Sequence, residues 1–80
     1  MSPILRLNTV SKAYTGNQSF PADSSRGYFF IVMTSAAGTV EFGEGGGLIP
    51  LANGQFYEPF VCPISQIDVV TTGTFVVHSA

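Results

Sequence analysis

Cys62 and His78 are the one pair of side chains in this 80-residue sequence that could supply a nucleophile and its general base. Such a pair needs a third polar group to orient the histidine and an electropositive setting that lowers the pKa of the thiol. Cys62 instead lies in the apolar stretch "FVCPIS", with no cation near it in the sequence. A lone cysteine in that context is typical of a small buried hydrophobic residue. We therefore expect no catalytic residue, and we expect the single histidine to be exposed or at an interface.

The acidic residues predict neither a metal site nor an acid–base pair. Glu41 and Glu44 are near neighbours, but a calcium site needs a carboxylate-rich loop with further oxygen ligands. No spacing of histidine and cysteine matches a zinc site. The five carboxylates of the chain are too dispersed to single out a general acid and a general base. The sequence therefore predicts a protein without enzymatic activity, metal or cofactor.

The glycine-rich stretch "EFGEGGGLIP", residues 41–50, could be a phosphate cradle, a linker or a turn. A phosphate-binding loop needs a Lys and a Ser or Thr after its last glycine, followed by a helix. Here Gly47 is followed by Leu48, Ile49 and Pro50, and the proline blocks a helix. A linker is excluded because neither flank is large enough to fold alone. We expect a tight connection between strands, at positions that need positive φ or close backbone approach.

Charged residues make up only 10% of the chain, against about 25% in a typical soluble domain. A surface with so few charges is either neutral and polar or partly buried against a partner, and we expect both. The three cations, Arg6, Lys12 and Arg26, cannot form the basic stripe that binds nucleic acid or anionic lipid. The longest apolar run, "YFFIVM", is also far shorter than the ~20 residues of a membrane span. We therefore expect no nucleic-acid partner and no membrane partner.

Apolar residues recur at two-residue spacing in short runs, and no stretch shows helical spacing. The expected strands are 3–8, 27–34, 38–42, 48–51, 55–60, 65–70 and 74–79. Strand 27–34 is apolar on both faces, which predicts a central position. Residues 9–26 are mostly polar and are expected to form a long loop. The pattern predicts one all-β domain, a small β-sandwich or barrel, jelly-roll-like, of about six to seven short antiparallel strands.

Two turns are predicted in the second half of the chain. Asn53-Gly54 favours a type I′ turn, in which both central residues take positive φ. Residues 65–70 and 74–79 are expected to pair as a hairpin through "TTG". The inward-facing residues of these two strands are expected to be Ile67, Val69, Phe75 and Val77.

Phe56 and Tyr57 are adjacent in an expected strand, so their side chains point to opposite faces. The outward one is covered either by a second sheet of the same chain or by a neighbouring subunit, and the sequence leaves both open. A core of this size leaves a thin stability margin, which favours self-association. The candidate interface residues are Arg6, Lys12, Tyr14, Phe20, Arg26, Phe56, Tyr57 and Phe60.

The block "IPLANGQFYEPFVCPISQIDV" (49–69), followed by "GTFVVH" (73–78), resembles small β-proteins encoded near the capsid genes of tailed bacteriophages. Those proteins decorate the outside of the head as cement proteins or head-fibre knobs. The likeness extends over residues 38–78, about half of the chain, and rests on a pattern of glycine, proline and apolar residues. It implies a non-enzymatic structural virion protein, made in the host cytoplasm, that binds the major capsid protein on the head surface. It also implies self-association as a homotrimer.

Residues 1–26 hold all three cations, whereas four of the five acids follow residue 40. We expect residues 1–26, an N-terminal strand and a polar arm or loop, to grip the capsid or a neighbouring subunit. Residues 27–80 would then form the projecting β-domain. The alternative is that 3–8 is an edge strand and the remainder a surface loop. A different function also stays open, a carbohydrate- or receptor-binding β-module of a phage tail or fibre, with exposed tyrosines stacking on sugar rings.

Overall fold

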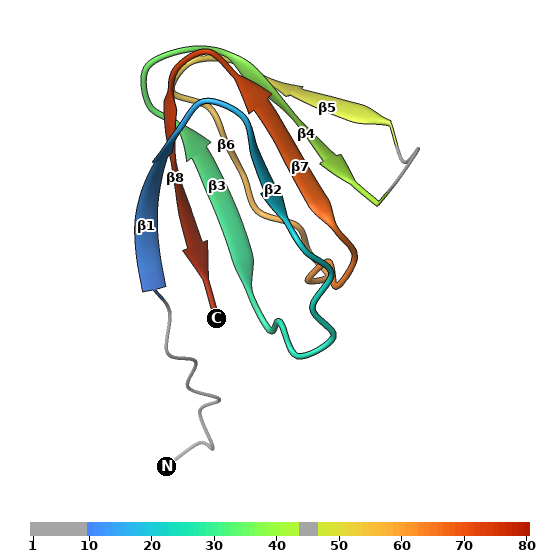
Figure 1. Ribbon diagram of the computed structural model, residues 1–80. Coiled ribbons are helices and arrows are strands. Elements are labelled where there is room, and N and C mark those ends of the chain that lie inside the picture. Colours follow the sequence, from blue (N-terminus) through green and yellow to red (C-terminus); the bar gives the residue numbers. More distant parts are fainter. Residues whose placement is uncertain (1–9, 44–46) are drawn as a thin grey trace.

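The computed structural model describes residues 10–43 and 47–80 as two antiparallel four-stranded sheets packed face to face (Figure 1). Sheet A runs in the order β1 (Val10–Thr15), β8 (Thr74–Ser79), β3 (Phe29–Met33) and β6 (Phe56–Tyr57). Sheet B runs in the order β2 (Gln18–Phe20), β7 (Ile67–Thr71), β4 (Gly38–Phe42) and β5 (Leu48–Leu51). The all-β sandwich expected from the sequence is confirmed, with eight strands where about six to seven were expected. Nowhere in these ranges does a helix occur that is long and apolar enough to cross a membrane.

The chain changes sheet after almost every strand, and only β4 and β5 are consecutive strands that pair with each other. Four short connections, at 16–17, 34–37, 52–55 and 72–73, cross between the sheets at one end, here called the arch end (Figure 1). The longer connections 21–28 and 58–66 lie at the opposite end, here called the loop end, where β1 begins and β8 finishes. This strand order is that of an eight-stranded jelly roll.

The core lies between the sheets and is built from alternate residues of the inner strands. The residue pattern of β3 puts Phe29, Ile31 and Met33 inward, and β3 lies between β8 and β6, as its sequence predicts. The buried apolar residues are Phe29, Ile31, Met33, Val40, Leu51, Ile67, Val69, Phe75 and Val77. Each sheet therefore contributes one apolar inner face, which is the requirement for a sandwich.

The expected hairpin between residues 65–70 and 74–79 is wrong in its pairing. The four predicted inward residues are buried, but β7 pairs with β2 and β4, while β8 pairs with β1 and β3. The connection carries the chain from sheet B to sheet A, and Gly73 within it packs against the β3–β4 connection. A Cβ at Gly73 would lie 2.6 Å from that of Ala36. Alternation has the same period in paired strands and in strands that face each other across a core, so it does not distinguish them.

The expected type I′ turn at Asn53-Gly54 is also wrong. Gly54 has a φ of 85°, but no residue other than glycine has positive φ among the described residues. The Gln55 amide donates to the Ala52 carbonyl at 3.0 Å. A positive φ at the second central residue alone is the pattern of a type II turn. The turn joins β5 of sheet B to β6 of sheet A, so it needs no hairpin geometry.

The polar segment expected as a loop over 9–26 contains β1 and β2, so that expectation is wrong for residues 10–15 and 18–20. Both are edge strands, so each has a neighbouring strand on one side only. Only Tyr14 and Phe20 among their residues pack against the core. The expected strand 3–8 lies outside the described residues.

The glycine stretch connects β4 to β5, as expected for a strand connection. Gly43 and Gly47 have φ values of 78° and 92°, so both use the positive φ that glycine permits. Glu44 lies outside the described residues. Pro50 lies in β5, at an edge of sheet B, where a missing backbone donor is tolerated.

Candidate functional site: two apolar surfaces and an edge pocket

The outer face of sheet A is largely apolar, above all over β3, β6 and the middle of β8. Residues directly opposite each other in an antiparallel pair share a face, so the register of the buried residues assigns their neighbours to the outside. Outer face A is defined by Ser11, Ala13, Thr15, Phe30, Val32, Phe56, Thr74, Val76 and His78. None of these side chains is an acid, a lysine or an arginine, and the carboxylate of Glu58, bonded to the Tyr28 hydroxyl, lies at the border of the face. Phe56 is 58% exposed, and Phe30, Val32, Val76 and His78 are half-buried by one another.

Contacts link one row of outer face A from one edge of the sheet to the other. The Ser11 hydroxyl and His78 Nδ1 are hydrogen-bonded at 2.7 Å. The His78 ring meets Phe30 edge-on, with ring centroids 5.2 Å apart, and Phe30 stacks on Phe56 at 5.4 Å. The row thus joins β1, β8, β3 and β6 in spatial order, which keeps the rings in fixed positions.

The outer face of sheet B is more polar. Outer face B is defined by Ser19, Thr39, Glu41, Leu48, Pro50, Asp68 and Val70. Ser19 Oγ donates to Asp68 Oδ1 at 2.7 Å, and Gln66 Nε2 donates to the same oxygen at 3.1 Å. The Ser19 bond first, and then the Gln66 bonds, lower the pKa of Asp68. Glu41 lies opposite Asp68 in the register, so this face carries two neighbouring negative charges.

A second apolar surface lies at the loop end. Phe60 is fully exposed, and Val61 and Ile64 are 76% and 53% exposed. These three residues form the loop-end patch, on the β6–β7 connection. Arg26 holds this connection in place, because its guanidinium donates to the Pro63 carbonyl at 2.6 Å and to the Pro21 carbonyl at 2.9 Å. The patch is therefore displayed by an anchored loop.

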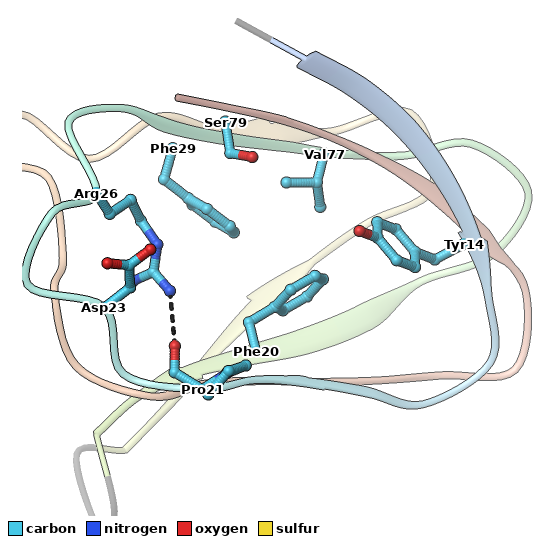
Figure 2. Close-up of a pocket in the computed structure, with 8 residues that line it drawn as sticks. All are labelled: Tyr14, Phe20, Pro21, Asp23, Arg26, Phe29, Val77 and Ser79. Atoms are coloured by element: carbon cyan, nitrogen blue, oxygen red, sulfur yellow. Dashed lines mark hydrogen bonds between the residues drawn. The ribbon is translucent and has the colours of Figure 1, made fainter.

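A pocket of about 230 Å³ opens between the sheets beside β1 and β2 (Figure 2). It is lined by Tyr14, Phe20, Pro21, Asp23, Arg26, Phe29, Val77 and Ser79. Figure 2 shows the aromatic rings turned toward one space, with Asp23 and Arg26 at one end of it. The Ser25 hydroxyl and amide both donate to Asp23 and lower the pKa of its carboxyl. The pocket has the mixed lining of a small-ligand site.

The rings of this pocket are already engaged with each other. Tyr14 stacks on Phe75 at 5.4 Å and meets Phe20 edge-on at 5.1 Å. Lys12 Nζ also lies over the Tyr14 ring, 5.4 Å from its centroid. The guanidinium of Arg26 donates its hydrogen bonds to backbone carbonyls. The arrangement therefore stabilises the open edge of the sandwich, and few hydrogen-bonding groups are left in the pocket to bind a ligand.

The predicted interface residues separate into three groups. Lys12, Tyr14, Phe20 and Arg26 gather around the edge pocket, Phe56 lies on outer face A, and Phe60 lies in the loop-end patch. Tyr57 turns inward and packs on Phe42, with centroids 5.8 Å apart. The chain's own second sheet thus covers Tyr57, whereas Phe56 stays exposed. Arg6 lies outside the described residues.

Sequence reasoning missed most of outer face A. Val32 and Val76 lie next to each other in the register, with Ala13 beside Val76. A signal was present, since "YFFIVM" and "FVV" are apolar at both parities. A strand that is apolar on both faces implies a cover on both faces, but the sequence alone does not show which strands stand side by side.

Cys62 and His78 do not form a hydrogen-bonded pair. The Cys62 thiol is half-buried and lies 3.7 Å from the Pro63 carbonyl, and burial raises its pKa. A raised pKa disfavours the nucleophilic thiolate. His78 is bonded to Ser11 on outer face A, consistent with the position expected for it. Within the described ranges, no cluster of three or more histidine, cysteine and acidic residues could hold a metal ion.

The geometry therefore offers two apolar surfaces suited to binding proteins, and a small pocket between the sheets whose side chains are already bonded or packed against their neighbours. Comparison with protein-family models, with curated proteins and with solved structures finds no match for this chain.

Proposed function

We propose that this chain is a non-enzymatic structural protein of a phage virion that binds the outer surface of the head as a decoration or cement protein. One observation carries the proposal: the loop-end patch exposes Phe60 and Val61 almost completely on an anchored loop. Large exposed apolar groups mark protein-binding sites, and an anchored loop loses little entropy on binding. The patch also lies within the block that resembles phage head proteins, residues 49–69.

In this proposal the major capsid protein is the partner at the loop end. The start of β1 and the 21–28 connection lie at the same end (Figure 1). A gripping role for residues 1–26 therefore remains compatible with attachment through the loop end, and it stays a prediction. The protein would be made in the host cytoplasm, would act on the virion, and would need no cofactor, nucleic acid or membrane. The jelly roll supports this reading at fold level only, since viral capsid domains and lectins both use it.

Purified virions of the phage that encodes the chain test the proposal. Denaturing electrophoresis should show an 8.5 kDa band in copy numbers comparable with the capsid protein. Purified protein should also co-sediment with undecorated heads, and Phe60→Ser with Val61→Ser should abolish this. Leu48→Ser is the matched control, because Leu48 is 63% exposed but lies on outer face B. Absence of the chain from virions, or equal binding by both variants, would overturn the proposal.

A carbohydrate- or receptor-binding module is the second candidate, and one feature favours it. Beside Phe60, the Tyr28 hydroxyl donates to the Glu58 carboxylate in a shallow pocket of about 330 Å³. An exposed ring next to a hydroxyl and a carboxylate can stack on a sugar and bond its hydroxyl groups. A glycan array distinguishes the candidates. Saturable binding that Phe60→Ala and Glu58→Gln both remove, by a chain absent from heads, would establish this function instead.

A further inference from the structure

We propose that outer face A packs against outer face A of a second copy, so that the protein forms a two-fold symmetric dimer through the outside of sheet A. This inference deepens the proposed function, because it assigns self-association to a surface separate from the loop-end patch. It can be tested without capsids, so its failure and that of the virion role are distinguishable.

The charges of the two outer faces indicate which of them can pack against a second copy of the chain. A two-fold contact brings each patch against an identical patch, so any net charge on it is repeated across the interface. Outer face A carries no lysine or arginine and a single carboxylate at its border, that of Glu58, which accepts a hydrogen bond from the Tyr28 hydroxyl. Outer face B would instead bring the neighbouring Glu41 and Asp68 against their own copies. Like charges that meet across an interface cost several kcal/mol. Of the two outer sheet faces, outer face A can therefore meet itself with less repulsion.

The side chains of outer face A have the composition of an interface core. Aromatic residues are enriched and charged residues depleted in such cores. Phe30 and Phe56 stack at 5.4 Å, and the Phe56 ring, 58% exposed, is the most exposed large apolar side chain of the face. Val32 and Val76 lie between Phe56 and Ala13, so one continuous apolar row crosses the sheet. A second sheet that packs on this row would bury it as the inner faces are buried.

The size of outer face A predicts a weak dimer. The four strands have 6, 6, 5 and 2 residues. At about 3.3 Å per residue and about 4.8 Å between strands, they cover about 300 Å². Two copies then bury about 600 Å² in total, and more once the exposed rings are included, which is below the usual range of specific interfaces. The dimer should consequently be weak and form only at high micromolar or higher concentration. At a capsid surface, where many copies are held close together, the effective concentration is far higher.

The contact also predicts the stoichiometry. A face that packs on its own copy is completely covered once two copies meet, so no further copy can add to it and the assembly closes as a dimer. The resemblance to head-fibre knobs implies a trimer instead, which requires a different, head-to-tail contact. The molecular mass of the assembly separates the two.

Sedimentation velocity of the purified full chain, over about 1 to about 500 µM, tests the inference. The mass should rise with concentration from 8.5 kDa to twice that value. Phe56→Lys should raise the dissociation constant at least about tenfold. The matched control is Leu48→Lys: Leu48 is also on an edge strand and is 63% exposed, and this change should alter the dissociation constant less than about twofold.

A second variant keeps the test valid if Phe56→Lys fails to fold. Ala13→Glu places a charge at the other edge of outer face A, on an exposed residue that loses no packing, and should weaken the dimer similarly. Circular dichroism verifies the fold of each variant. A mass of 8.5 kDa at every concentration, three times that mass, or equal effects of Phe56→Lys and Leu48→Lys would each overturn the inference.

Discussion

The two outer faces of this sandwich differ although their inner faces are alike. On outer face B the carboxylate of Asp68 accepts hydrogen bonds from Ser19 and Gln66, with Glu41 beside it. Its exposed apolar residues, Leu48 and Val70, lie in separate rows of the register, among polar neighbours. On outer face A a row of contacts crosses all four strands, from Ser11 through His78 and Phe30 to Phe56. Outer face B is polar enough to remain exposed to water, whereas outer face A is an apolar surface of the kind that other proteins cover.

The difference shows that the inner and the outer residues of one strand meet separate requirements. Inner residues must be apolar for the sandwich to form, so they reveal nothing about partners. Outer residues of a solvated sheet are usually polar, so apolar residues there call for a second explanation. In β3 the two requirements are visible side by side, since Ile31 faces the core and Val32 faces outward.

The largest effect is expected from truncating these two neighbours in turn. Ile31 is fully buried, so Ile31→Ala should reduce the free energy of unfolding by about 2–5 kcal/mol. Val32 is half-buried on outer face A, so Val32→Ala should cost about 1 kcal/mol in dilute solution. Urea denaturation at low protein concentration measures both. Equal losses would mean that sheet A has no distinct inside and outside.

Repeating the Val32→Ala measurement at high protein concentration sharpens this contrast. In a dimer the wild-type residue is buried against the second copy, so the cost of truncation should rise. Ile31→Ala should show no such additional cost, because its contacts lie within one chain. A Val32→Ala cost independent of concentration would argue that outer face A stays exposed.

A smaller effect is expected from a fixed charge at His78, which lies between Ser11 of β1 and Phe30 of β3 in the register. Neither neighbour can compensate a positive charge. His78→Lys should therefore weaken association several-fold, whereas His78→Gln, which adds no charge, should weaken it less. Sedimentation velocity measures both variants. Equal dissociation constants for the two variants would contradict the expectation.

The smallest effect concerns outer face B. Hydrogen bonds from Ser19 and Gln66 lower the folded-state pKa of Asp68, so the ionised form stabilises the fold at pH above about 4. This stability is lost as the pH falls through the folded-state pKa. Ser19→Ala removes the largest cause of the shift, so the acid-induced loss should be shallower than in the wild type. Thermal denaturation between about pH 6 and 2 measures it. Identical profiles would show that the Ser19 bond contributes nothing in solution.

The inner faces were predictable from sequence, and the neighbours of each strand were not. Period-two alternation identifies Val40, Ile67 and Phe75 as inward residues because burial forces it. The same alternation wrongly suggested that β7 and β8 are paired, since it is indifferent to whether two strands lie side by side or across the core. β1 and β2 were missed because edge strands need few apolar residues.

The candidate surfaces were predictable only in part for a related reason. Local sequence singles out Phe60 and predicts that Phe56 and Tyr57 point to opposite faces. The structure shows that Phe56 is the outward residue and Tyr57 the inward one. Outer face A combines residues as distant in sequence as Ser11 and His78, which only the register of β1 with β8 brings together. Without strand order, an apolar outer residue is indistinguishable from a core residue.

Intermolecular nuclear Overhauser effects in a mixture of isotope-labelled and unlabelled protein test most directly whether outer face A is the covered face. At millimolar concentration, where a weak dimer is populated, we predict cross-peaks between the ring protons of Phe30 and Phe56 in one copy and the methyl groups of Val32 and Val76 in the other. Leu48 and Val70 on outer face B should give none. Intermolecular cross-peaks from outer face B, or none from either face, would contradict the distinction between a covered outer face A and a solvated outer face B.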